Sequence, residues 1–258
     1  MPVICIANQK GGVGKTTTTA ALAQGVTEYQ KRVLLIDWDP QASLTVALGF
    51  NPDNLKHTGY DILRSIIENN ENILVNDVVV KTKNPDIDLI PANIELSQAQ
   101  LDLVELSNRA LVLKEIILPM CRLYDYILVD CSPSLGLLTI NALSAADEVI
   151  IPLQADFLAM KGLTLLLNTI IRVKDRVNPA LNISGIVFTM TNSRTLHCRE
   201  VIEVTKRAFG DRIRVFNTLI PTSVKFKEAP AAGVSILTYA PNSVAADAYR
   251  LLTKEVIE

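Results

Sequence analysis

The chain has 258 residues and a formal net charge of −2, and hydrophobic residues make up 49% of it. A chain of this length buries a core easily, and it is not a polycation, so any contact with nucleic acid must come from a local basic patch. The four cysteines form no CxxC pair, which argues against a zinc site or a disulfide framework and suits a reducing compartment.

Short apolar runs rich in Val, Ile and Leu alternate along the chain with segments of helical periodicity. Strands are predicted over residues 2–8, 32–39, 88–92, 124–130, 148–153, 183–190 and 215–220. Most of these runs lack polar alternation, as strands covered on both faces do. Helices are predicted over residues 15–29, 96–120, 135–144, 161–177, 199–209 and 243–257. The alternation predicts a single α/β domain over residues 1–258, with a doubly wound, mainly parallel sheet flanked by helices and no preceding DNA-binding domain.

A glycine-rich segment, GGVGKTT, follows the first predicted strand and opens the first predicted helix. This context is typical of a P-loop, in which glycines let backbone N–H groups cradle phosphate oxygens at a helix N-terminus. Lys15 is expected to reach the terminal phosphates, and the Thr16 hydroxyl is expected to ligate Mg²⁺. The expected nucleotide-binding residues of this loop are Gly11, Gly12, Val13, Gly14, Lys15, Thr16 and Thr17.

Acidic residues end two of the predicted strands. Asp130 ends the run YDYILVD, where a carboxylate can hold Mg²⁺ through water. Asp37 and Asp39 end the run RVLLIDWD, on a strand expected to neighbour the first. The carboxyl ends of parallel strands face the ligand crevice, so the three acids are expected to gather beside the phosphates.

Four segments, KGGVGKTT, DWDPQASLT, DCSPSLGLLTINAL and IPTSVKFKEAPAAG, together resemble the ParA/Soj family of Walker-type partition ATPases, which is related to MinD and to the nitrogenase iron protein. The resemblance runs from Ile4 to the final helix. It implies that Lys10 is the signature lysine of a deviant Walker A loop and reaches across a nucleotide-sandwich homodimer to the partner's phosphates. A cation supplied in this way would make bound ATP hold the dimer together. Gly11 and Gly12 would let the two loops approach face to face.

The resemblance also implies roles for the strand-end acids. Asp39 resembles the switch I carboxylate that orients the attacking water, and with Lys10 and Lys15 it forms the expected catalytic set. Asp37 resembles an outer-shell Mg²⁺ partner, and Asp130 resembles the Walker B acid. With the Thr16 hydroxyl, these two acids form the expected metal site.

Two switch segments depart from the family pattern. The stretch expected to sense the γ-phosphate contains Pro133, Ser134 and Gly136. Ser132 stands where the family usually has a further proline, and Ala42 and Ser43 stand where switch I usually has Gly and Asn. Asn192 and Pro221 follow predicted strands at positions where the family contacts adenine.

Basic residues are concentrated between residues 194 and 227. Eight bases and three acids give this stretch a charge near +5, whereas the remainder of the chain is near −7. Such an asymmetry is typical of a patch that binds a phosphate backbone, although a charge run is also typical of a solvated helix face. The resemblance implies nonspecific binding to double-stranded DNA by an ATP dimer, which doubles the patch. The expected DNA-binding residues are Arg194, Arg199, Lys206, Arg207, Arg214, Lys225 and Lys227, and Arg212 is the eighth base.

The resulting hypothesis is a slow ATPase of the cytoplasm and nucleoid. A ParB-like partner would stimulate it to move chromosome, plasmid or organelle cargo. A MinD-like membrane ATPase is the main alternative, but the final helix lacks the basic amphipathic pattern it needs, and no apolar run reaches the roughly 18 residues of a membrane span. An iron–sulfur protein is a third reading. Cys131 follows the Walker B acid, but no second cysteine lies at the expected place.

Overall fold

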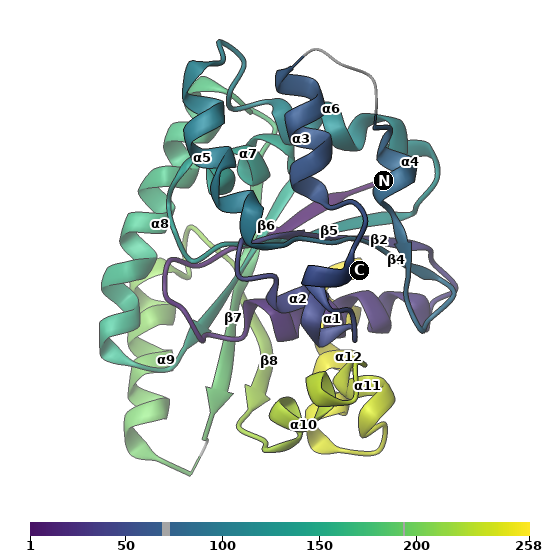
Figure 1. The fold of residues 1–258 in the computed structure, drawn as a ribbon. Helices are drawn as coiled ribbons and strands as arrows, with labels where there is room; N and C mark the ends of the chain where they lie inside the picture. The colour runs from purple at the N-terminus through teal and green to yellow at the C-terminus, as the bar shows by residue number, and fades with distance from the viewer. Residues whose placement is uncertain (69–72, 193) are drawn as a thin grey trace.

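An eight-stranded sheet forms the centre of the computed structural model, which describes residues 1–68, 73–192 and 194–258 (Figure 1). The strand order is β3-β4-β2-β5-β1-β6-β7-β8, and all neighbouring strands are parallel except β3 and β4. The strands are β1 Val3–Ile6, β2 Val33–Trp38, β3 Val80–Lys81, β4 Ile87–Ile90, β5 Tyr126–Cys131, β6 Glu148–Gln154, β7 Asn182–Thr191 and β8 Val215–Pro221. The helices are α1 Lys15–Thr27, α2 Ser43–Ala47, α3 Gly59–Ile67, α4 Val75–Val78, α5 Ala99–Asp102, α6 Val112–Ile117, α7 Leu137–Ala145, α8 Phe157–Arg176, α9 Leu196–Phe209, α10 Lys225–Ala231, α11 Ile236–Tyr239 and α12 Val244–Ile257.

Helices cover both faces of the sheet and create two apolar layers. Successive residues of a strand point to opposite faces, so Cys5 packs in one layer while Ile4 and Ile6 pack in the other. The first layer receives side chains from α3, α6, α7, α8 and α9. The second receives side chains from α1, α2, α11 and α12, and Figure 1 shows α10, α11 and α12 gathered beside α1. The central strands are therefore buried on both sides, which explains their continuous apolar runs.

The strand register brings the predicted acids together. β5 lies between β1 and β2, and the pairing aligns Asp130 with Ile6 on one side and with Asp37 on the other. The loop that follows β1 thus begins beside the ends of the two strands that carry acids. This edge of the sheet holds the candidate site.

The doubly wound α/β fold and each of the seven predicted strands are confirmed. The prediction of one helix over residues 96–120 is wrong, because the chain there forms short separate helices. A turn in which the N–H of Leu111 donates to the carbonyl of Asn108 interrupts the helical path, and Leu101 and Val104 on the periodic positions remain exposed. The two-residue strand β3 and the helices α2, α4, α10 and α11 were not predicted, since each is too brief to show a clear period. The nine-residue helix α3 was also not predicted, although it is as long as α7.

Three of the four cysteines are buried, and Cys121 is half-buried. Within the described ranges, none of the helices combines the length and the apolarity needed to cross a membrane.

Candidate nucleotide and magnesium site

The glycine loop occupies the gap between β1 and α1. Gly12 and Gly14 have φ angles of +73° and +86°, in the left-handed region that disfavours side chains. This conformation explains why glycine stands at both positions. The loop is also tied to β7, because the Thr189 hydroxyl donates to the carbonyl of Val13 at 2.8 Å. The loop is therefore already shaped, with α1 beginning directly after it.

Lys15, the first residue of α1, is held inside this loop. Its side chain is buried, and its Nζ donates to the carbonyl of Lys10 at 3.2 Å. Burial lowers the pKa of Lys15, and the negative charge of Asp130 partly opposes that shift. The hydrogen bond of this ammonium group goes to a neutral carbonyl, so an anionic phosphate would replace the carbonyl favourably.

The strand-end acids hold hydroxyl groups from the neighbouring elements. The Thr16 hydroxyl donates to Asp130 Oδ2 at 2.6 Å. Thr45 of α2 donates to Asp37 Oδ2 twice, from its backbone N–H at 2.8 Å and from its hydroxyl at 2.7 Å. Asp37 Oδ1 is buried and has no hydrogen-bond partner. Asp39 is also buried and accepts a bond from the N–H of Gln41 at 3.0 Å.

The electrostatics of these acids fit a divalent cation. Burial raises the pKa of Asp37 to about 7. Burial, and next the charge of Asp37, raise the pKa of Asp130. Two buried carboxylates that resist ionisation side by side would both be stabilised as anions by Mg²⁺. Among the described residues, no group of three or more His, Cys, Asp or Glu side chains is placed to hold a metal ion by itself.

Lys10 forms an ion pair within its own chain. Its Nζ lies 3.0 Å from Asp156 Oδ2 and 3.1 Å from Gln154 Oε1. Gln154 ends β6, which neighbours β1, so the end of β6 lies beside the loop that follows β1. The reach of Lys10 to a partner subunit stays a prediction. Sequence reasoning missed both partners, because no motif marks them and only the strand order brings them close.

The remaining predicted nucleotide contacts lie at the same edge of the sheet. Thr191, the residue before Asn192, pairs in register with Pro221 on the adjacent strand. In the switch II stretch the Ser132 and Ser134 hydroxyls lie 3.4 Å apart, and the Ser134 carbonyl accepts from the Thr139 hydroxyl. A Cβ added at Gly136 would lie 2.9 Å from Oε1 of Gln100. The contacts of these residues with nucleotide stay predictions.

The predicted DNA-binding bases are all exposed but lie at two ends of the sheet. One group follows the carboxyl ends of β7 and β8 and consists of Arg194, Arg199, Lys225 and Lys227. The other group lies near the opposite ends and consists of Lys206, Arg207 and Arg214, and the eighth base of the stretch, Arg212, lies with it. The seven residues of β8 separate Arg214 from the first group by about 23 Å. Arg214 also pairs with Glu255 at 3.6 Å.

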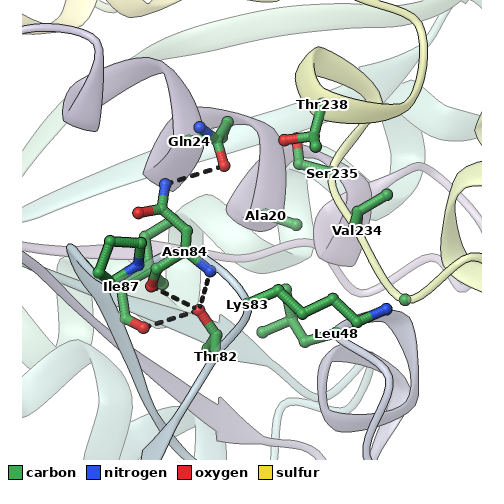
Figure 2. A pocket seen from close by; sticks show the side chains of 12 residues that line it. Ala20, Gln24, Leu48, Thr82, Lys83, Asn84, Ile87, Val234, Ser235 and Thr238 are labelled. Carbon is green, nitrogen blue, oxygen red and sulfur yellow. Dashed lines mark hydrogen bonds between the residues drawn. The ribbon is translucent and has the colours of Figure 1, made fainter.

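A cavity of ≈ 280 Å³ lies on another part of the surface (Figure 2). Ala20 and Gln24 of α1, the turn from Thr82 to Ile87, and the segment from Gly233 to Thr238 supply most of its lining. Figure 2 shows Asn84 bonded to Gln24 and Lys83 extended beneath Val234. None of the predicted nucleotide-binding residues line this cavity.

The parallel sheet, the glycine loop before α1 and the acids at adjacent strand ends define a P-loop nucleotide-binding protein. A family model described as an AAA domain matches residues 1–183. The chain belongs to the ParA/Soj family of chromosome-partitioning ATPases, as the resemblance predicted.

The chain is 43% identical to the sporulation initiation inhibitor protein Soj of Bacillus subtilis, over 98% of this chain and 97% of Soj. It is 41% identical to the chromosome partitioning protein ParA of Caulobacter vibrioides, over 99% of this chain and 93% of that protein. Among solved structures, cobyrinic acid a,c-diamide synthase from Mycobacterium smegmatis with a bound ATP analogue and magnesium gives a TM-score of 0.85 at 35% identity, covering 98% of this chain and 93% of that chain.

Proposed function

We propose that this chain is an Mg²⁺-dependent ATPase that hydrolyses ATP to ADP and phosphate slowly through a single domain. Its ATP-bound homodimer would bind nonspecific double-stranded DNA in the cytoplasm, on the nucleoid. A ParB-like partner would stimulate hydrolysis, and the cycle would segregate or position chromosome, plasmid or organelle cargo. The observation that carries the proposal is the convergence of Lys15, Thr16 and the acids Asp37 and Asp130 at one loop.

Each group at the loop has a chemical task in this proposal. Lys15 would exchange the Lys10 carbonyl for the terminal phosphate oxygens, and the loop N–H groups would bind the remaining phosphate charge. Thr16, Asp37 and Asp130 would hold the metal. Mg²⁺, when bound, would neutralise charge that develops on the transferred phosphoryl group. Asp39 would orient the attacking water.

The DNA contact is assigned to the bases beside the edge of the sheet that holds the candidate nucleotide site. Arg194, Arg199, Lys225 and Lys227 are exposed and follow the carboxyl ends of two adjacent strands. A patch at this edge would stand close to the loops that meet in a sandwich dimer. Two copies would then present one extended basic surface, which makes DNA affinity depend on dimerisation.

The test measures three properties of the wild-type chain and of Lys10→Ala. With Mg²⁺ and a non-hydrolysable ATP analogue, the wild type should dimerise and bind random-sequence DNA, with an affinity that falls steeply as salt rises. With ADP both properties should be lost, and Lys10→Ala should stay monomeric with the analogue. A wild type that stays monomeric with saturating analogue would refute the proposal. Binding to anionic liposomes in place of DNA would favour the MinD-like alternative.

A further inference from the structure

Tyr249 joins the last helix to the first turn of α1, which follows the glycine loop. It lies on α12 and is almost completely buried, and its hydroxyl is 3.0 Å from the Thr18 hydroxyl of α1. Thr18 is fully buried in the first turn of α1, directly after Thr16 and Thr17. A displacement of this turn, such as bound phosphate could cause, would strain or break a buried hydrogen bond to Tyr249.

The other side of Tyr249 meets α10. The ring of Phe226 packs against the ring of Tyr249 edge to face, with centroids 5.8 Å apart and an interplanar angle of 88°. Such a contact is directional, because the positive edge of one ring faces the negative face of the other. Phe226 stands between Lys225 and Lys227, whose side chains are both exposed. The same turn of α10 therefore carries two ammonium groups outward and one ring inward.

α10 and the first turn of α1 also face each other across a small void. A cavity of ≈ 40 Å³ is lined by Thr16 and Thr17 of α1 and by Phe226, Ala229 and Pro230 of α10, together with residues of α2 and of the start of α11. Side chains that border a void lose packing contacts on that side, which leaves room for the two helices to move relative to each other. Beside this void, the ring contact of Tyr249 with Phe226 joins α12 to α10, and its hydroxyl contact with Thr18 joins α12 to α1.

We propose that Tyr249 is a positioning residue that couples the nucleotide-bound state of α1 to the placement of Lys225 and Lys227 on α10. The proposal rests on the proposed ATP-dependent DNA binding. It adds the element that transmits the nucleotide state to the basic surface. Because coupling between two ligands is reciprocal, DNA must tighten nucleotide binding by the same factor by which nucleotide tightens DNA binding.

The test compares Tyr249→Phe, which removes the hydroxyl and keeps the ring, with Arg250→Gln. Arg250 is the next residue of α12, and it bonds to Glu28, the residue that follows α1, on the exposed side. This variant controls for weaker docking of α12 on α1. The measured quantity is the ratio of DNA affinities with ATP analogue and with ADP, at one salt concentration. Nucleotide affinity with and without DNA gives the reciprocal factor.

For Tyr249→Phe we expect the ratio to fall about fivefold, with dimer formation by the analogue unchanged, since a neutral hydrogen bond contributes to this extent. Arg250→Gln should keep the wild-type ratio. Thr18→Val should reproduce the loss, and the double variant should lose no more than either single variant. Phe226→Leu, which removes the ring contact, should also lower the ratio and provides a test should the tyrosine variant fold poorly.

An unchanged ratio in Tyr249→Phe, or a loss of dimerisation in parallel with the loss of DNA binding, would overturn the coupling. A wild type without ATP-dependent DNA binding would instead overturn the proposed function from which the coupling follows. The two failures are therefore separated by the wild-type measurement.

Discussion

The ion pair between Lys10 and Asp156 opposes dimerisation if Lys10 has to reach a partner subunit. The ammonium group is 3.0 Å from Asp156 Oδ2, and the two side chains are 36% and 37% exposed. Asp156→Asn removes the charge while keeping the shape. We therefore expect this variant to dimerise with an ATP analogue at lower protein concentration than the wild type.

The magnitude follows from the exposure of the pair. A half-exposed ion pair contributes about 0.5–1 kcal/mol, and a sandwich dimer would break two of them. The total of about 1–2 kcal/mol corresponds to a half-dimerisation concentration about 5- to 30-fold lower. The contact with Gln154 Oε1 at 3.1 Å remains in the variant, which keeps the effect within this range.

Sedimentation equilibrium with saturating Mg²⁺ and analogue measures this concentration directly. The control is Glu258→Gln, which removes an exposed ion pair of 3.7 Å with Lys254 at the end of α12 and should leave dimerisation unchanged. In about 1 M salt the difference between Asp156→Asn and the wild type should shrink, because screening already weakens the pair. Equal or weaker dimerisation of Asp156→Asn in low salt would show that the ion pair does not oppose dimerisation.

Three further variants test the site and its support. Burial raises the pKa of Glu255, but hydrogen bonds from β8 lower it by more, so the net pKa is below its usual value. The ionised Glu255 therefore stabilises the folded chain above pH 4.5, and this stabilisation is lost as the pH falls through the folded-state pKa. Glu255→Gln should cost about 1 kcal/mol in urea unfolding at pH 7, and the difference from the wild type should vanish in acid. Asp37→Asn should raise the melting temperature of the nucleotide-free chain by about 2–4 °C at pH 8, since it removes a buried charge beside Asp130. The same variant should no longer be stabilised by Mg²⁺ with analogue. A lower melting temperature of the nucleotide-free variant would contradict the electrostatic account. Gly25→Ala places a Cβ 2.1 Å from the Thr253 hydroxyl oxygen and should destabilise by about 1–3 kcal/mol, with partial recovery in the double variant with Thr253→Ala.

The fold and the conformation of the glycine loop could be predicted from sequence because their signals are local. A buried parallel strand has a continuous apolar run, and a left-handed turn favours glycine at positions such as Gly12 and Gly14. The meeting of Asp37 and Asp130 needed one further rule, that parallel strands end at a common edge. The broken helix over residues 96–120 was not predictable in this way, since a periodic pattern does not reveal a turn inside it.

The non-local part of the site escaped prediction for a different reason. Asp156 and Gln154 lie about 145 positions from Lys10 in the sequence and carry no motif, so only the β1–β6 pairing brings them together. The basic stretch shows the converse case, in which residues that are close in sequence lie far apart in the fold. Arg194 and Arg214 are close in sequence, but the intervening helix α9 carries the chain to the other end of the sheet.

The groups assigned to the nucleotide already have partners within the chain. Lys15 bonds to the Lys10 carbonyl, Thr16 bonds to Asp130, and Lys10 pairs with Asp156. Nucleotide binding therefore exchanges existing interactions for new ones, and its free energy is the difference between the two sets. Asp37 Oδ1 is an exception, because it is buried with no hydrogen-bond partner. A metal ion would therefore supply an interaction that Asp37 Oδ1 lacks, without breaking an existing hydrogen bond of that atom. We expect nucleotide without Mg²⁺ to bind weakly.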